Sequence, residues 1–523
     1  QTFDAINPVS SSTKSFVMEN QLKWPKDIID IHCHMFNLKY LPIAGILVRY
    51  SHGWIPNLVA RGVEWLLLRN TGESFSADNE NFSDIKKYSN DTYNIKLTDY
   101  LKKEQFEYKV REIFSFEPEN SIDAIENMVY VGDLMEGEFS KALMEFEKLD
   151  NPDNENGILI EHFSEDDEIK YRAGLLRRML RKIIDVLEMG LNYIRWFIFM
   201  TNSENDIYTH ITKKDAKEAS VFLHMMMDVD HFFNKNKNNL KYESYFDYET
   251  QVSNMQKLNS QHGNLIGFVA FNPARKGSLE IVKKAIKEKG FKGVKFYPPM
   301  GYKAFEDHNY GKEIEELVKF SVAENVPLFT HCNNKGFEAR PGKGHSGYNS
   351  NPVYWEQLLE KYNNLILCLG HAGGTEGWFS NNKPEDYVKP DDIVAGNIED
   401  EKEKQEKNWN ASYASMVYKL CVKYKNVYCD ASYLDDMINS DNTFDPGARN
   451  NFKTRLLKLF SAKPEFARKI IYGSDWHMLF QEAKNAVYLE KYVEFFSDDE
   501  FDKHRDNFFF NNANLFLAAK SEN

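Results

Sequence analysis

The run IIDIHCH, residues 28–34, is apolar at its start and ends in two histidines, His32 and His34. A short run that is rich in isoleucine and follows charged residues predicts a β-strand. Side chains two residues apart on a strand point to the same face, so both imidazoles would lie on one side of it. Neutral imidazole is the commonest ligand for zinc, and two at this spacing can hold one divalent ion.

Seven further apolar runs follow, each bounded by Gly, Pro, Asn or Asp, and helix-like segments separate most of them. Near-continuous apolarity is typical of parallel strands that are buried on both faces. Eight strand–helix units predict an α/β fold, a closed (β/α)8 TIM barrel. An open doubly wound sheet is the alternative, but no glycine-rich phosphate fingerprint follows any run. The strand candidates are residues 28–34, 221–228, 265–271, 293–297, 327–332, 365–370, 427–431 and 470–474, and the helix candidates include 278–289, 313–324, 352–362, 413–424 and 486–496.

The chain has 523 residues, whereas a TIM barrel typically takes ~250. Most of the excess lies between the first two strand candidates, and it includes an apolar stretch at 40–68 and a helix-like segment at 173–189. Because this segment leaves the barrel directly after His34, we expect it to cap the mouth and to influence substrate choice. The expected parts are an N-terminal extension (1–26), a metal-dependent barrel (27–35 and 220–523) and a large, mainly helical insertion after the first strand (36–219).

The composition excludes several functional classes. Hydrophobic residues make up 42% and charged residues 28%, as in ordinary globular proteins. The net charge of -14 argues against a nucleic-acid-binding surface, which requires clustered positive charge. No apolar stretch is long enough to cross a membrane, and the five scattered cysteines favour a reducing, cytoplasmic location over a disulfide framework. We expect a small-molecule substrate as the partner, and homo-oligomerisation stays open.

Four later strand candidates also carry ionisable residues near their ends. Lys295 lies in the run GVKFY, His331 lies near the end of the fifth strand candidate, and His371 and Asp475 directly follow the sixth and the eighth. Because the carboxyl ends of parallel barrel strands meet at one mouth, we expect these side chains to converge with the two histidines of the first strand. An ionisable group such as Lys295 inside an apolar strand is unfavourable unless it is paired or chemically used.

These residues, in this order, resemble the site of the amidohydrolase superfamily of metal-dependent barrels. The details are similar to the amidohydrolase-related group, which also contains aminocarboxymuconate-semialdehyde decarboxylase and resorcylate decarboxylase. The stretches that carry the resemblance are FKGVKFYPP (291–299), PLFTHC (327–332), WEQLLEKYNNLILCLGHAGG (355–374), IYGSDWH (471–477) and, for a closing helix, NNANLF (511–516). The resemblance covers residues 27–35 and 262–518 but not about 36–220, and it is specific for fold and metal chemistry rather than for substrate.

The resemblance implies a set of metal ligands and leaves the metal count open. It implies His32, His34, His331 and Asp475 as ligands, with His371 as a catalytic histidine or as a ligand of a second metal. Lys295 is implied either as an unmodified charge beside one metal or as a carboxylated lysine that bridges two. Three nitrogens and one carboxylate favour Zn²⁺, with one ion per chain preferred to two, although manganese or iron would fit the same donors.

The expected activity is that of a metal-dependent hydrolase that uses a metal-activated water on an amide, ester or lactone bond of a small molecule. Asp475 would act as a general acid–base as well as a ligand, and His371 would polarise the substrate carbonyl. The alternative is a zinc-dependent, non-oxidative decarboxylase of a small aromatic or unsaturated carboxylic acid. A barrel that binds metal without turnover is disfavoured, because every expected site residue is present.

Loops at the mouth are expected to select the substrate. The loop after the fifth strand candidate contains Arg340 and His345, and arginine is suited to bidentate contacts with a carboxylate. His477, two residues after Asp475, is a further candidate for contact with the substrate. Asp430 falls at the end of the seventh strand candidate, but the sequence assigns it no role.

Overall fold

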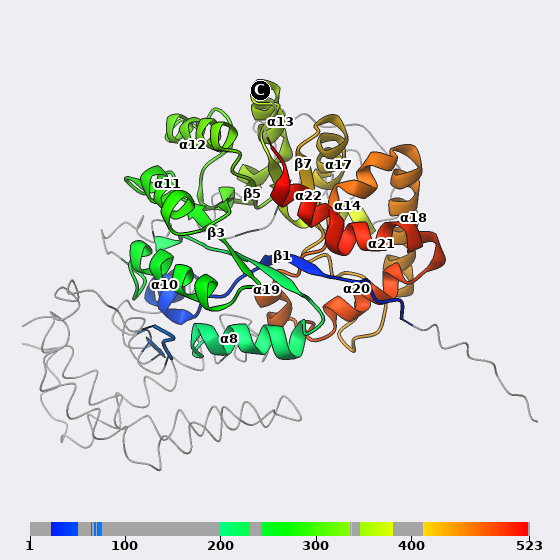
Figure 1. Ribbon diagram of the computed structural model, residues 1–523, viewed down its shortest axis with the longest axis horizontal. Coiled ribbons are helices and arrows are strands. Elements are labelled where there is room, and N and C mark those ends of the chain that lie inside the picture. Colours follow the sequence, from blue (N-terminus) through cyan, green and yellow to red (C-terminus); the bar gives the residue numbers. More distant parts are fainter. Residues whose placement is uncertain are drawn as a thin grey trace, which may run out of the picture.

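The structure is a computed structural model, and its described part forms one parallel sheet surrounded by helices (Figure 1). The described residues are 22–50, 64, 67–68, 71–75, 196, 199–230, 242–334, 336, 346–379 and 412–520.

The eight strands are hydrogen-bonded in the order in which they occur along the chain, and every adjacent pair is parallel. The barrel is nearly closed between its first and last strands, where the amide of Ile31 donates to the carbonyl of Tyr472 at 3.3 Å. All eight predicted strands are confirmed, although several end earlier than the apolar runs because the runs continue into the loops at the mouth. The strands are β1 (Ile29–Cys33), β2 (Val221–Met225), β3 (Leu265–Phe271), β4 (Gly293–Phe296), β5 (Leu328–Thr330), β6 (Leu367–Leu369), β7 (Val427–Asp430) and β8 (Ile470–Ile471).

The amino end of the barrel is filled by apolar side chains, among them Phe268 and Tyr428. Helix α22 (Asn512–Ala518) covers this end, and its buried Phe516 ring lies 6.3 Å from the Phe268 ring and 5.6 Å from the Tyr428 ring, measured between centroids. The side chain of Asn512 fixes the helix by donating to the carbonyls of Ala467 and Ile470. The predicted closing helix is therefore confirmed, and the polar strand ends lie at the opposite, carboxyl end.

The helices pack around the outside of the strands (Figure 1). Each of the longer helices buries an apolar face, as α11 does with Val282 and Ala285, and all five predicted helices are confirmed with small differences at their ends. The outer helices are α10 (Tyr248–Gln261), α11 (Ser278–Glu288), α12 (Gly311–Glu324), α13 (Pro352–Lys361), α14 (Glu376–Phe379), α17 (Tyr413–Lys423), α18 (Pro446–Ala462), α19 (Trp476–Gln481), α20 (Tyr488–Phe496) and α21 (Asp502–Asp506). Short helical turns are η4 (Pro298–Met300), η5 (Ser346–Ser350), η6 (Gly370–Gly373), η8 (Pro464–Arg468), η9 (Asp499–Phe501) and η10 (Asn507–Asn511).

The chain between β1 and β2 begins and ends in helical elements that lie together. These are η1 (Leu38–Tyr40), α1 (Ile43–Tyr50), α8 (Glu204–His210) and η3 (Ile211–Asp215). The amide of Leu38 donates to the carbonyl of Met200 at 3.0 Å, and the hydroxyl of Tyr40 donates to the Glu204 carboxylate at 2.9 Å. The two ends are therefore adjacent, as an insertion into the barrel requires. The predicted helix at 173–189 lies outside the described residues, and the division into extension, insertion and barrel stays a prediction.

Two expectations from the composition can be compared with the structure. All five cysteines are buried free thiols, as expected from their scatter along the sequence. Among the helices that the structure describes, none is both long enough and apolar enough to span a lipid bilayer.

Candidate metal centre

The carboxyl ends of the strands bring together all six ionisable residues that the sequence singled out in and after the strand candidates. They are His32, His34, Lys295, His331, His371 and Asp475, and each is less than 9% exposed. Burying so many ionisable groups at one point is unfavourable unless they satisfy one another or hold a ligand.

His32, His34 and Asp475 form a first group of candidate metal ligands. One donor atom from each lies within 4.8 Å of the others, and the Nε2 atom of His34 is 3.5 Å from the Oδ1 atom of Asp475. The Nδ1 atom of His34 is buried without a hydrogen-bond partner. Buried polar side-chain atoms are usually satisfied, so an unpartnered ring nitrogen at this point fits a site that holds a metal ion.

The first group is brought together where the chain after β8 approaches the end of β1. β1 ends at Cys33, so His34 lies just beyond the strand rather than on it, and the pairing of β1 with β2 is irregular between Asp30 and Cys33. The amide of Asp475 donates to the carbonyl of His32 at 2.7 Å, while Asp475 itself has a left-handed backbone with φ 53°. An added Cβ atom at Gly473 would lie 3.0 Å from the Cβ atom of His32, so glycine permits the close approach of the two chain segments.

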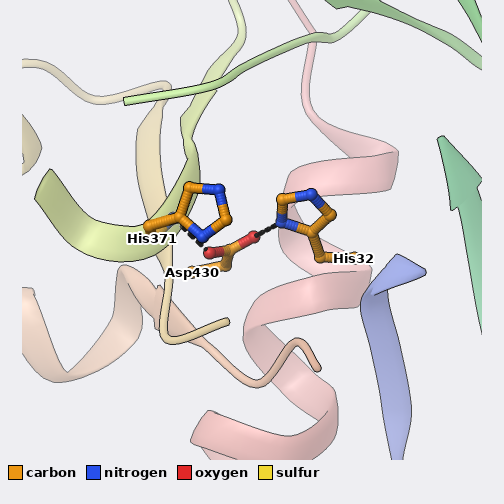
Figure 2. Close-up of side chains that lie close together, drawn as sticks. All are labelled: His32, His371 and Asp430. Carbon is orange, nitrogen blue, oxygen red and sulfur yellow. Dashed lines mark hydrogen bonds and ion pairs between the residues drawn. The ribbon is translucent and has the colours of Figure 1, made fainter. Parts of the chain in front are cut away.

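Asp430 and Ser432, at the end of β7, hold His32 from the other side. The Oδ2 atom of Asp430 is 2.9 Å from the Nδ1 atom of His32, and the hydroxyl of Ser432 is 2.8 Å from the same nitrogen. The Oδ1 atom of Asp430 accepts from the amide of His371 at 2.6 Å. Figure 2 shows the Asp430 carboxylate between His32 and His371, and these three residues form a second group that could hold a metal ion.

His371 connects this second group to His331. The Nε2 atom of His371 is 3.1 Å from the Nδ1 atom of His331, and the Nδ1 atom of His371 is 3.1 Å from the carbonyl oxygen of Ser432. His371 has a left-handed backbone with φ 57°, which the Asp430 carboxylate helps to hold through the His371 amide. His331 therefore borders the metal-ligand candidates through His371, and neither of the two ligand groups found among the described residues includes it.

Lys295 is buried against His32, a residue that both candidate ligand groups share. Its side chain is 1% exposed, its Nζ atom is 3.0 Å from the Nε2 atom of His32, and it lies over the ring of Phe329. Burial lowers the pKa of Lys295 to about 8, although the negative charges of Asp475 and Asp430 oppose the shift. An amine with this pKa changes its charge more readily near neutral pH than an exposed lysine does.

The electrostatics of the other residues follow from burial and from their neighbours. Burial, with the nearby charge of Lys295, lowers the pKa of His32 to about 4, and burial together with His477 lowers the pKa of His34. Burial alone would raise the pKa of Asp475, but His477 and His32 outweigh it, so that this pKa lies well below its usual value. The imidazoles of His32 and His34 are thus in the neutral form and the Asp475 carboxylate in the ionised form, which are the forms that bind a metal ion.

The three predicted substrate contacts have different outcomes. The Nδ1 atom of His477 lies 3.2 Å from the Oδ1 atom of Asp475, and its ring centroid is 4.7 Å from that of His34, so His477 does border the site. Arg340 and His345 lie outside the described residues.

The sequence missed the residues that support the ligands. Besides Asp430 and Ser432, the buried Asp30 accepts from the amides of His32 and Ser474 at 3.1 and 3.0 Å, and burial raises the pKa of Asp30 to about 7. Asp430 could have been found, because it ends a strand just as the predicted ligands do. Ser432 carries no sequence signal of its own.

No protein-family model and no curated protein matches the sequence, whereas several solved TIM-barrel structures are similar to it. An uncharacterised TIM-barrel protein from Bordetella bronchiseptica has a TM-score of 0.36 at 11% identity, over 60% of this chain and 82% of its own. An amidohydrolase from Burkholderia multivorans with bound zinc has a TM-score of 0.37 at 10% identity, over 60% and 88%. A 4-oxalomesaconate hydratase from Rhodopseudomonas palustris has a TM-score of 0.31 at 11% identity, over 73% and 92%.

Proposed function

We propose that the chain belongs to the amidohydrolase superfamily and is a metal-dependent hydrolase that cleaves an amide, ester or lactone bond of a small molecule. The observation that carries this proposal is the meeting of His32, His34 and Asp475 at the carboxyl end of an eight-stranded parallel barrel, with donor atoms within 4.8 Å of one another. Barrel enzymes carry their active sites at this end, on residues from several strands. The unpartnered Nδ1 atom of His34 supports a bound ion there.

The donor set favours zinc, with one ion per chain. When bound, a divalent ion supplies Lewis acidity and a water molecule of lowered pKa. The residues that would hold it are His32, His34, His331 and Asp475, and His371 and a carboxylated Lys295 would join them if two ions are bound. Manganese and iron suit the same nitrogen and oxygen donors.

The residues of the chain would then move protons and orient the substrate. The ionised carboxylate of Asp475 would accept a proton from the attacking water and return it to the leaving group, so it would be both ligand and general acid–base. His371 would orient His331 toward the substrate carbonyl rather than donate to that carbonyl itself, because its Nδ1 atom faces the carbonyl oxygen of Ser432 and its Nε2 atom faces His331. His477, in contact with Asp475, would line the same space.

A non-oxidative decarboxylase of a small carboxylic acid is the second candidate. The observation that favours it is Lys295, a buried cation whose hydrogen-bond partner is the imidazole of His32 rather than a carboxylate. A buried ammonium group is stabilised by an anion, and a substrate carboxylate would supply one.

Metal analysis and product analysis together test the proposal. We expect about one zinc per chain by elemental mass spectrometry of protein purified without chelators, and two per chain would instead support a carboxylated Lys295. The metal-loaded protein is then assayed on panels of lactones, esters, small amides and aromatic carboxylates. Hydrolysis without carbon dioxide release supports the hydrolase, carbon dioxide release supports the decarboxylase, and protein that binds no metal contradicts both.

Asp475→Asn tests the proposed proton transfer. We expect kcat to fall by ~10²–10⁴, the range of general acid–base catalysis, while the histidines retain much of the metal. The matched control is Asp228→Asn, which neutralises another buried carboxylate, one that lies beyond the end of β2 and is paired with Arg275. Full activity of the Asp475→Asn variant would show that Asp475 does not transfer the proton.

A further inference from the structure

We propose that the end of β7, Asp430 and Ser432, positions three histidines of the candidate metal centre by determining which ring nitrogen of each carries the proton. The histidines are His32, His371 and His331. The use of their bare nitrogens as metal ligands rests on the proposed function, whereas the proton positions follow from the hydrogen bonds alone. Asp430 and Ser432 are thus positioning residues, which act through the imidazoles.

The proton of His32 is placed by Asp430. An ionised carboxylate is only an acceptor, so the Nδ1 atom of His32, 2.9 Å from the Oδ2 atom, must carry the proton. The hydroxyl of Ser432, 2.8 Å from the same nitrogen, donates its own proton to the Oδ1 atom of Asp430 at 2.7 Å and is left as an acceptor too. The Nε2 atom of His32 is therefore bare, and it faces the amino group of Lys295 at 3.0 Å.

The proton of His371 is placed by Ser432. The Nδ1 atom of His371 lies 3.1 Å from the carbonyl oxygen of Ser432, which can only accept, and 3.0 Å from its hydroxyl. Nδ1 must therefore carry the proton, and a neutral His371 has a bare Nε2 atom. Asp430 orients the same residue, because its Oδ1 atom accepts from the His371 amide at 2.6 Å.

The proton of His331 then follows from that of His371. The bare Nε2 atom of His371 is 3.1 Å from the Nδ1 atom of His331, and a hydrogen bond between two nitrogens needs one proton. That proton belongs to His331, so its Nε2 atom is bare as well. Through this relay, Asp430 and Ser432 would present the Nε2 lone pairs of both His32 and His331, the form in which imidazole binds a metal ion.

Nuclear magnetic resonance of the metal-free wild-type protein tests the proton positions directly. Protein labelled with ¹⁵N in its histidine rings gives long-range ¹H–¹⁵N spectra that distinguish protonated from bare ring nitrogens, and single His→Gln variants assign the three rings. We expect protonated Nδ1 and bare Nε2 atoms in His32, His371 and His331 near neutral pH. A proton on the Nε2 atom of His32 or of His371 would overturn the proposal without the need for any further variant.

Asp430→Asn tests the cause of these positions. Asn can keep its side-chain oxygen toward the backbone amide of His371 only by turning its NH₂ group toward His32. The NH₂ group and the protonated Nδ1 atom of His32 would then be two donors facing each other. We expect the Nδ1 proton of His32 to lose its fixed acceptor, so that the Nδ1-protonated form no longer dominates the spectra, and the zinc Kd, measured by chelator competition, to rise ~10–100-fold. Asp228→Asn, which neutralises a buried carboxylate that accepts from Arg275, should leave the His32 spectrum and the zinc Kd unchanged.

Ser432→Ala provides a smaller change in the same network. It removes the hydroxyl but keeps the backbone carbonyl that accepts from His371, so the His371 proton should stay on Nδ1 while zinc binds more weakly than to wild type. An unchanged zinc Kd in both Asp430→Asn and Ser432→Ala would contradict the proposal. If the spectra show the expected proton positions but the protein binds no metal, the proposed function is refuted and the proposal about proton positions stands.

Discussion

Replacing Lys295 by Met should stabilise the metal-free protein near neutral pH and flatten its stability profile at alkaline pH. Burial lowers the pKa of Lys295 from 10.5 to about 8, so the folded state holds its proton less tightly than the unfolded state does. Below about pH 8 both states are charged and the full burial penalty is present. As pH rises to about 10.5 the folded state loses the proton first, and the penalty disappears.

The size of this effect can be worked from the two pKa values. The shift from 10.5 to about 8 corresponds to about 3 kcal/mol, at ~1.4 kcal/mol per pKa unit. Met fills a similar volume without charge but loses the hydrogen bond to His32, worth about 1 kcal/mol. We therefore expect Lys295→Met to raise the free energy of unfolding by about 2 kcal/mol near pH 7 and to lower it slightly near pH 10.5.

Urea unfolding of chelator-treated protein, in buffers free of carbon dioxide so that the amine stays unmodified, provides the measurement. Lys283→Met, on the outer helix α11 at an exposed ion pair with Glu280, is the matched control and should follow the wild-type profile. Parallel profiles of wild type and Lys295→Met across this pH range would refute the reasoning, because they would show that the buried amine carries no charge penalty.

Three further predictions concern the barrel and its metal. Gly473→Ala places a Cβ atom 3.0 Å from the Cβ atom of His32, so it should weaken zinc binding ~10-fold and destabilise the fold by ~1–3 kcal/mol. The control is Gly263→Ala, whose added Cβ atom would have no neighbour within 4 Å and should not change zinc affinity. Equal zinc Kd values in the two variants would contradict the prediction. Phe516→Ala should lower the free energy of unfolding by ~3–5 kcal/mol in urea titrations while leaving zinc affinity intact, and Leu515→Ala, at an exposed neighbour, should change little. Zinc at ~100 times its Kd should stabilise the metal-free protein by about 3 kcal/mol, measured as a rise in Tm, and His32→Gln should remove most of this rise.

The fold could be predicted from the sequence because its signals are local. Each strand is an apolar run buried on both faces, and the residues that bound it are visible without knowledge of its partners. Strand ends were less accurate: β8 is only Ile470–Ile471, although the apolar run continues to Ser474. The difference arises because residues at the mouth leave the hydrogen-bond ladder to form the site, as when the amide of Asp475 donates to His32.

The candidate ligands could be predicted for a related reason, and their support could not. His32 and Asp475 lie at or just after the ends of apolar runs, and an ionisable residue in that position is conspicuous in the sequence. Asp430 ends a strand too, but a sequence does not show whether its carboxylate faces a metal, an imidazole or solvent. Its bond to His32 joins residues 398 positions apart, and only the closed barrel brings them within 2.9 Å.

The sequence by itself determined the number and order of the strands and the residue types at their carboxyl ends, because both depend on short runs of side chains and on the direction of parallel strands. The tertiary structure alone decided which atoms of those residues meet. Hydrogen-bond partners, and with them the proton positions of His32 and His371, depend on distances between strands that are far apart in the chain. The chemistry predicted for the strand ends therefore depends on residue types, which the sequence shows. The roles of Asp430 and Ser432 depend on contacts that exist only in the closed barrel.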